Sequence, residues 1–240
     1  MRIALLSDIH ANLCALDAVA AAVGSVDQVL QLGDVVGYGP EPDATVQRLM
    51  DLRAGGVRGN HDAAACGGQE IEWFNPAARR ALEWTRRVIA PATLGWLEML
   101  PSRVVEPPFT LVHGSPREPT WEYVTSPDVA SASFASLQTR HGLHGHTHVP
   151  MAWRLDAGRI EAIDPRGTPL LHLDERPTLL NPGSVGQPRD GDPRAAWALL
   201  DTEAGTCTWH RTSYDVAAVQ AAIRQAGLPA WLADRLAVGA

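Results

Sequence analysis

The chain has 240 residues, of which 45% are hydrophobic and 20% charged, and its formal net charge at pH 7 is -7. This composition is typical of a folded globular protein and excludes intrinsic disorder. The length is compatible with a single domain covering residues 1–240. The negative charge argues against a surface that follows the phosphates of nucleic acid, so nucleic acid is not expected as a partner.

The cysteines and the hydrophobic runs exclude two further classes of protein. Cys14, Cys66 and Cys207 are far apart and form no CxxC pair, which argues against a redox motif or a thiolate metal site. No apolar run approaches the roughly 20 residues that span a bilayer, and the N-terminus lacks a signal-peptide pattern. We therefore expect a cytoplasmic protein without a membrane partner, and the sequence leaves its oligomeric state open.

The first hundred residues alternate short apolar runs with helical spacing. Strands are predicted at residues 3–6 and 28–32, a short apolar piece ends at Val57, and helices are predicted at residues 13–23, 42–53, 76–89 and 94–100. This alternation favours a layered α/β fold with helices packed outside a sheet.

From residue 102 onward the pattern changes to strands separated by Pro and Gly. Strands are predicted at residues 104–105, 110–112, 153–155, 160–163, 170–173 and 196–200, with one more leading into Gly145. These runs are interpreted as a second sheet. Two helices, near residues 216–223 and 231–236, are expected to end the chain.

Five short segments place side chains that can bind metal at or near the ends of predicted strands. They are Asp8-Ile9-His10, Gly33-Asp34, Gly59-Asn60-His61-Asp62, His113-Gly114 and Gly145-His146-Thr147-His148. Residues two apart on an extended segment point to the same side, so Asp8 can converge with His10, and His146 with His148. Imidazole and carboxylate groups without a thiolate suit Mn, Fe, Co, Ni or Zn.

This ordered series resembles that of the calcineurin-like metallophosphoesterases, with D-x-H, G-D, G-N-H-[DE], a histidine before glycine and G-H-x-H between residues 8 and 148. Residues 181–189 (Asn-Pro-Gly-Ser-Val-Gly-Gln-Pro-Arg) are similar to a C-terminal signature of the small bacterial phosphodiesterase and phosphatase branch. The resemblance implies an α/β (α+β) fold, a four-layer αββα sandwich of two mixed sheets.

The resemblance also implies two divalent or trivalent transition metal ions, Mn, Fe, Zn, Co or Ni, with Mn expected to support activity. By position, the ligands would be Asp8, His10 and His148 for the first metal and Asn60, His113 and His146 for the second, with Asp34 bridging the two. Bridging by Asp34 is expected because each of its two carboxylate oxygens can serve one metal.

Five further residues are candidates for catalysis or substrate binding. His61 is expected to be the catalytic histidine, which donates a proton or stabilises charge at the leaving oxygen. Asp62 either orients His61 or caps a helix, and Asn12 either caps the helix at residues 13–23 or binds the substrate. Tyr38 either flanks the substrate pocket or packs over a turn, and Arg189 either binds a phosphate or holds a loop.

Other histidines and tryptophans receive structural interpretations. His141, His144, His172 and His210 are interpreted as surface or hydrogen-bonded core histidines, and His144 is alternatively a neighbour of the metal ligands. Trp73, Trp84 and Trp96 are expected in the core or at an interface, not against substrate.

The activity implied is hydrolysis of a phosphate ester by a hydroxide that bridges two metals. Small-molecule phosphodiesters or phosphomonoesters, including nucleotides, are the expected substrates. Residues 33–39 (Gly-Asp-Val-Val-Gly-Tyr-Gly) lack the G-D-x-x-D-R-G pattern of serine/threonine protein phosphatases and their dinucleoside-polyphosphatase relatives, so both activities are disfavoured. The alternatives are a non-enzymatic metal-binding interaction scaffold of the same fold, or a nuclease.

Overall fold

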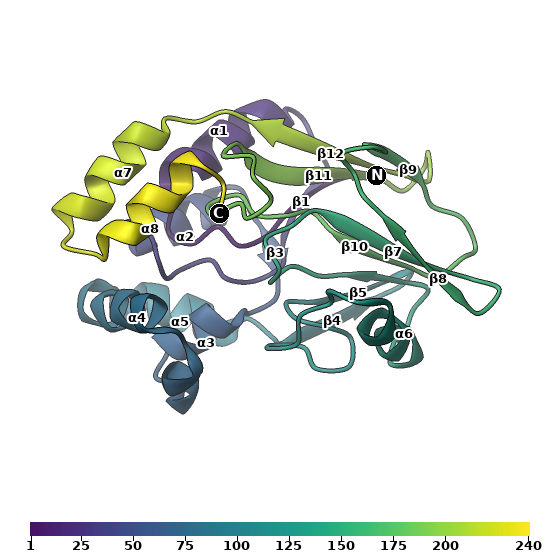
Figure 1. Cartoon of the computed structure of the whole chain (residues 1–240), viewed down its shortest axis with the longest axis horizontal. Helices are drawn as coiled ribbons and strands as arrows, with labels where there is room; N and C mark the ends of the chain where they lie inside the picture. Colours follow the sequence, from purple (N-terminus) through teal and green to yellow (C-terminus); the bar gives the residue numbers. More distant parts are fainter.

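The computed structural model describes the backbone of residues 1–240 and all side chains except those of residues 69 and 70. Its strands form two mixed six-stranded sheets (Figure 1). The first sheet has the order β3 (Gly55–Gly56), β2 (Gln28–Gln31), β1 (Arg2–Leu6), β11 (Ala195–Asp201), β12 (Thr206–Thr212) and β9 (Leu170–His172). The second has the order β4 (Arg103–Glu106), β5 (Phe109–Val112), β6 (His141–Leu143), β10 (Thr178–Asn181), β7 (Met151–Asp156) and β8 (Arg159–Ile163).

Three apolar cores divide the molecule into four layers, which confirms the expected αββα sandwich. Strand β1 shows how the sequence produces them, because its side chains alternate between the two faces of the sheet. Ile3 and Leu5 lie in the core between the sheets, whereas Ala4 and Leu6 lie in the core shared with the helices. A strand buried on both faces is therefore apolar throughout.

The helix layers are unequal in size. The core outside the first sheet contains residues from α1 (Leu13–Val23), α2 (Pro42–Asp51), α3 (Asn60–Ala65), α4 (Pro76–Val88), α5 (Pro91–Met99), α7 (Val216–Gln225) and α8 (Ala230–Asp234). The second sheet is covered by α6 (Pro127–Ala135), whose Ala130 packs with Trp153 and Leu179. Two short 3-10 helices, η1 (Gln69–Trp73) and η2 (Arg235–Ala237), complete the elements.

Local sequence signals explain where several helices begin. The side chain of Asn12 accepts a hydrogen bond from the backbone N–H of Ala15 and so caps α1. Pro42, Pro76 and Pro91 stand in the first turns of α2, α4 and α5, where a missing N–H costs nothing. The helices predicted at residues 13–23, 42–53, 76–89 and 94–100 are confirmed, with small shifts at their ends.

The interpretation of the later strands as one second sheet is wrong in part. Strands β9, β11 and β12 join the first sheet, where β11 pairs antiparallel with β1. Strands β10 and β12 and helix α6 were not predicted. Strands from both ends of the chain therefore share one sheet.

The topology brings the motif loops to one edge of the sandwich. Strands β1 and β2 are parallel, and so are β5, β6 and β10, so within each group the carboxyl ends of the strands point the same way. The segments that begin near Asp8, Asp34, His113, His146 and Asn181 each follow one of these ends. Ligand sites of layered α/β proteins commonly lie outside the carboxyl ends of their strands.

Candidate metal centre

The backbone of the motif loops is strained at five of the seven residues predicted to bind metal. Asp8, His10, Asp34, His146 and His148 have φ angles of 52°, 50°, 56°, 68° and 60°. This left-handed conformation is unfavourable for residues other than glycine and persists only where the surroundings impose it. Here backbone hydrogen bonds join the first two loops, from Asp8 N–H to Gly33 O at 3.0 Å and from His10 N–H to Asp34 O at 2.9 Å.

The first group of converging ligand atoms comes from Asp8, His10, Asp34 and His148, all of which are buried. His10 Nε2 lies 3.1 Å from His148 Nε2, and His148 Nε2 lies 3.2 Å from Asp8 Oδ1. His10 Nε2 also lies 3.7 Å from Asp34 Oδ2. These four side chains therefore face one point.

The second group comes from Asp34, Asn60, His113 and His146, and is buried as well. His113 Nε2 lies 3.3 Å from Asp34 Oδ2, 3.0 Å from Asn60 Oδ1 and 3.0 Å from His146 Nδ1. The structure thus brings the seven predicted ligands together in two groups that share Asp34.

Asp34 joins the groups in a way that differs from the expectation. Its Oδ2 faces both His10 and His113, whereas its Oδ1 accepts a hydrogen bond of 2.9 Å from the backbone N–H of His61. One oxygen, rather than one oxygen for each group, is therefore shared. The other oxygen holds the carboxylate in place.

The protonation of the four histidines follows from their outer contacts. In each ring the nitrogen that points away from the centre meets a backbone carbonyl oxygen, which can only accept a hydrogen bond, so that nitrogen carries the proton. The pairs are His10 Nδ1 with Val36 O at 3.2 Å, His113 Nδ1 with Leu32 O at 2.7 Å, His146 Nε2 with Trp121 O at 3.1 Å and His148 Nδ1 with Gln187 O at 2.6 Å.

When the rings are neutral, the nitrogens that face the centre present lone pairs to one another and to carboxylate oxygens. Asp8 Oδ1 is buried and has no hydrogen-bond partner among the described residues. The Asn60 amide oxygen faces atoms that can only accept hydrogen bonds, and the amide could donate to them only if its NH₂ group took the place of that oxygen. A cation bound between these atoms would satisfy all of them with the oxygen where it is. Two sets of converging, buried lone pairs without thiolates fit two transition metal ions.

The pKa values describe the charge of this cluster without metal. Burial alone would lower the pKa of His113, but the adjacent Asp34 carboxylate outweighs it and raises the pKa to about 9. Burial would raise the pKa of Asp34, yet His113 and His61 hold it well below its usual range. Burial lowers the pKa values of the remaining ligand histidines, His10, His146 and His148. Most of the imidazoles are thus neutral at pH 7, the form that binds metal.

His61 lies beside the first group, with its ring centroid 4.8 Å from that of His10 and 4.4 Å from that of Tyr38. Its Nδ1 is buried and has no hydrogen-bond partner in the described part of the chain. Asp62 does not use its carboxylate on His61. Its Oδ1 accepts from Val36 N–H and its Oδ2 from Gly59 N–H, both at 3.0 Å, so it joins two motif loops and caps α3.

The three predicted substrate-binding residues have different surroundings. Asn12 uses its side-chain oxygen to cap α1 and its NH₂ group to donate to Gly186 O, which favours its structural interpretation. Tyr38 and Arg189 both line the cleft over the ligand groups. The Arg189 guanidinium lies 5.8 Å from the centre of the Tyr38 ring and donates to Gln187 Oε1 at 2.8 Å.

The segment 181–189 holds the loops of the proposed metal ligands in place by hydrogen bonds. Ser184 Oγ donates to Asp8 O at 2.7 Å, and the Gln187 carbonyl holds the His148 ring. Asn181 Nδ2 donates to Gly145 O at 2.7 Å and lies 3.4 Å from His144 Nδ1, so His144 is indeed a neighbour of the ligand loops. The sequence did not indicate the contacts of Ser184 and Asn181 with these loops, because the partners are far apart along the chain.

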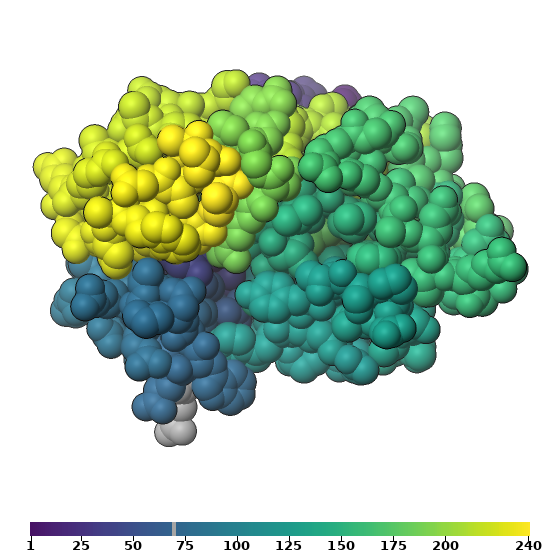
Figure 2. Space-filling model, viewed as in Figure 1, coloured from purple at the N-terminus to yellow at the C-terminus, as the bar shows by residue number. Residues whose placement is uncertain are grey.

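The ligand groups lie at the bottom of a cleft of about 320 Å³. In Figure 2 the yellow C-terminal segment and the blue segment that follows α3 border a hollow in which purple N-terminal atoms are visible. The sequence interpretation missed most of the cleft wall, which includes Trp73, Phe74, Trp121, Tyr123, Trp231 and Arg235. The prediction that Trp73 lies in the core is wrong, because the residue is 71% exposed at this cleft.

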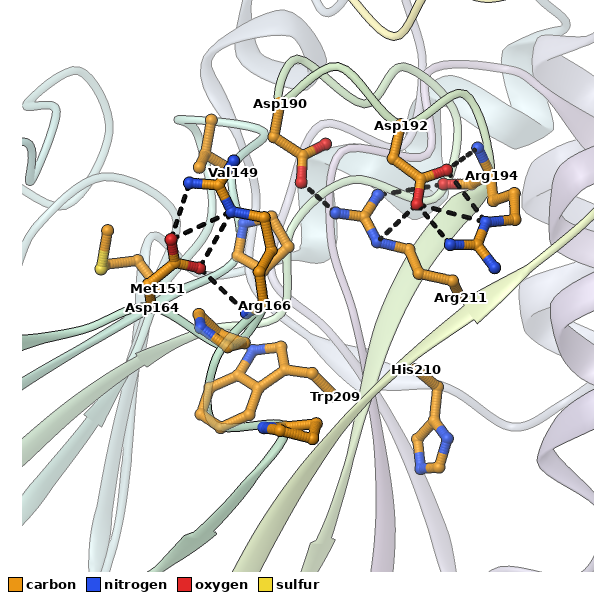
Figure 3. A pocket seen from close by; sticks show the side chains of 13 residues that line it. Val149, Met151, Asp164, Arg166, Asp190, Asp192, Arg194, Trp209, His210 and Arg211 are labelled. Carbon is orange, nitrogen blue, oxygen red and sulfur yellow. Dashed lines mark hydrogen bonds and ion pairs between the residues drawn. The ribbon is translucent and has the colours of Figure 1, made fainter.

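A second pocket, of about 300 Å³, lies away from this centre near β7 and β12 (Figure 3). Among the described residues that line it, none belongs to the predicted site. Its arginines are paired with its aspartates, as Arg166 with Asp164, Arg194 with Asp192 and Arg211 with Asp190. These pairs neutralise one another, so the pocket offers no free charge of the kind that the metal cleft offers.

Comparisons with known proteins agree with this geometry. The chain is 34% identical to uncharacterized protein MJ0912 of Methanocaldococcus jannaschii, over 99% of this chain and 98% of that protein. It is similar to the crystal structure of a metallophosphoesterase from Sphaerobacter thermophilus, with 43% identity, a TM-score of 0.92 and full coverage of both chains. It also shares its fold with hypothetical protein PH1004 of Pyrococcus horikoshii, with 19% identity, a TM-score of 0.83 and coverage of 100% and 98%.

None of the helices in the described chain is both long and apolar enough to cross a membrane. The family profile of the calcineurin-like phosphoesterase superfamily domain matches residues 1–205. Together with the two ligand groups that share Asp34, this match shows that the chain belongs to the calcineurin-like phosphoesterase superfamily.

Proposed function

We propose that this protein is a metal-dependent hydrolase of small-molecule phosphate esters, either monoesters or diesters and including nucleotides. The observation that carries the proposal is the pair of buried lone-pair groups that share Asp34 Oδ2 at the bottom of an open cleft. Every ligand position of the motif series is present, which an interaction scaffold without catalytic activity does not require.

The site offers distinct groups for the steps of phosphate ester hydrolysis. Two metal ions at these ligands, with Mn proposed to support activity, would supply Lewis acidity and an activated water molecule. Arg189, which Gln187 holds at the cleft, can donate to phosphate oxygens. Both contributions favour a phosphate group bound directly above the ligand groups.

His61 is the group proposed to act at the leaving oxygen. Burial lowers its pKa to about 4, so the ring is neutral at pH 7 in the absence of substrate. A phosphate anion bound beside it favours the protonated form, which can then donate to the leaving oxygen. The ring cannot drift far, because it packs between Tyr38 and Phe74 at centroid distances of 4.4 and 4.6 Å.

The size and charge of the site favour a small substrate over a nucleic acid strand. A cleft of about 320 Å³ is within the range of small-molecule sites. The net charge of -7 provides no general attraction for a polyanion. We therefore propose a small-molecule phosphoesterase rather than a nuclease.

The test compares Mn²⁺-loaded wild type with Asp34→Ala and His61→Ala on p-nitrophenyl phosphate, bis(p-nitrophenyl) phosphate and a panel of nucleotides. Asp34→Ala should lose both metal binding and activity, since Asp34 belongs to both groups. His61→Ala should keep its metal and lose about 10²- to 10⁴-fold in kcat, the range of a general acid.

The matched control is His172→Ala, which removes an exposed imidazole on β9 far from the centre and should change neither activity nor metal content. Folding is checked by thermal unfolding, and metal content by elemental analysis. A folded, metal-loaded wild type that hydrolyses no member of the panel would refute the proposal. Full activity of metal-loaded His61→Ala would refute only the role of His61.

A further inference from the structure

One wall of the metal cleft is a continuous row of aromatic rings. The row begins at His61, whose ring centroid lies 4.6 Å from that of Phe74. Phe74 lies 5.0 Å from Trp121, and Trp121 lies 5.1 Å from Trp73. All four residues line the cleft. The row therefore connects the proposed catalytic histidine with the surface of the protein.

The exposure of these rings rises from the inner to the outer end of the row. His61 is 3% and Phe74 8% exposed, whereas Trp73 is 71% exposed. Trp121 stands between them, partly buried, and its carbonyl holds the ring of the metal ligand His146. A single exposed tryptophan on a protein surface is common and indicates no function. An exposed indole that continues a buried aromatic row, however, offers apolar surface to a ligand at the cleft.

The other wall of the cleft carries fixed positive charge. Arg189 and Arg235 both donate to Gln187 Oε1, at 2.8 and 2.9 Å, so one amide oxygen positions two guanidinium groups. The Arg235 guanidinium also lies 4.3 Å from the ring centre of Trp231. It therefore covers one face of that indole. The cleft thus presents cations on one side and open aromatic rings on the other.

A molecule that complements both walls has an anionic phosphate and a flat ring. Rings stack on tryptophan with little dependence on their exact identity, because every base has a π-face. Alkyl phosphates and sugar phosphates would leave the exposed indole of Trp73 without a partner. The arrangement therefore discriminates by the group attached to the phosphate.

We propose that Trp73 and Trp121 form a ring-binding subsite that holds the base of a nucleotide, or a flat ring of similar size, while its phosphate lies at the metal centre. This inference rests on the proposed function, because it requires the phosphate to bind at the two groups of proposed metal ligands. It adds the class of substrate, a nucleotide-like phosphate ester, and the residues that select it.

The test measures, by titration calorimetry, binding to Mn²⁺-loaded protein of the non-hydrolysable methylene phosphonates of AMP and of ribose 5-phosphate, which differ in the base and are named below by their parent compounds. Stacking on an aromatic side chain contributes about 1–3 kcal/mol per base, so wild type should bind AMP about 5- to 150-fold more tightly. Trp73→Leu should bring this ratio close to one and leave the affinity for ribose 5-phosphate unchanged. Trp73→Phe, which keeps a ring, should retain most of the preference.

The control is Trp231→Leu, which removes the exposed indole of the opposite wall and should keep the preference for AMP. Because Trp73 is 71% exposed, its replacement should leave the thermal unfolding temperature nearly unchanged. Equal affinity of wild type for the two ligands would overturn the proposal. It would also be overturned if Trp231→Leu lost the preference for AMP while Trp73→Leu kept it. Since binding is measured without turnover, a preference for AMP in a protein that hydrolyses no ester would refute the proposed function and leave the subsite standing.

Discussion

Replacement of Gly59 by alanine is the sharpest steric test of the metal centre. Gly59 precedes the proposed ligand Asn60 and has a φ of -89°, which any residue can adopt, so the change introduces no backbone strain of its own. A Cβ atom there would lie 2.1 Å from Asp34 Oδ1 and 2.3 Å from the Asp34 backbone nitrogen. Neither atom can move freely, so α3 and the Asp34 loop must separate.

The cost of Gly59→Ala can be worked out from these contacts. Displacement of the Asp34 carboxylate breaks the 2.9 Å hydrogen bond that it accepts from His61 N–H. Loss of such a charged hydrogen bond, together with overpacking, should lower the free energy of unfolding by about 3–6 kcal/mol. Because the shared oxygen of Asp34 moves as well, the affinity for metal should also fall.

Two measurements test this reasoning: the urea midpoint of unfolding and the affinity for Mn²⁺ by titration calorimetry. The matched control is Gly95→Ala in α5, where a Cβ atom would meet nothing within 4 Å. It should stabilise the protein by up to about 1 kcal/mol, because alanine favours a helix over glycine. A Gly59→Ala protein with wild-type stability and Mn²⁺ affinity would show that Asp34 is not held against Gly59 as described.

Three further predictions concern stability. Asp62→Asn should cost about 1–3 kcal/mol in urea unfolding, because one amide oxygen cannot accept from both Val36 and Gly59 N–H, and an unchanged midpoint would contradict this. Mn²⁺ at 100 times its Kd should raise the free energy of unfolding by about 2.7 kcal/mol, and a chelator should remove this gain. A melting temperature that changes with neither Mn²⁺ nor the chelator would contradict metal binding at this site. Burial, with Arg140 nearby, lowers the pKa of His141 to about 4, so the folded protein keeps this ring neutral while the unfolded chain protonates it below about 6.5. Stability should therefore fall as pH drops from about 6.5 to 4, and His141→Gln should flatten this fall by about 1–2 kcal/mol; equal slopes would refute the assignment.

Much of the candidate site could be predicted because its signals are local. Side chains that can hold metal stand close together in short motifs, such as Asp8 and His10, and each motif loop follows a recognisable apolar run. The expectation of an extended segment at these residues is wrong, because Asp8 and His10 converge through a left-handed backbone. Helix starts were equally accessible, since the caps and first-turn prolines act within a few residues, as Asn12 does for α1. Most helices of the first hundred residues follow from such patterns, whereas the proposed ligand set also required the resemblance of the motif series to a known family.

The sheet partners could not be predicted in the same way. Periodicity indicates that β11 is a buried strand, but its pairing with β1, about 190 residues earlier, depends on how the whole chain packs. The same holds for Ser184, whose hydroxyl supports the Asp8 loop, and for the single shared oxygen of Asp34, which the backbone of His61 selects.

The clearest division between sequence and structure concerns the tryptophans. Composition and helical spacing treat Trp73, Trp84 and Trp96 alike, because an apolar ring fits a core, an interface or a ligand site equally well. Only the tertiary structure separates them, since it places Trp73 on the cleft wall next to Trp121, a residue far away in sequence. The sequence by itself determined which side chains can hold metal, whereas packing between residues distant in sequence decided which side chains form the cleft above them.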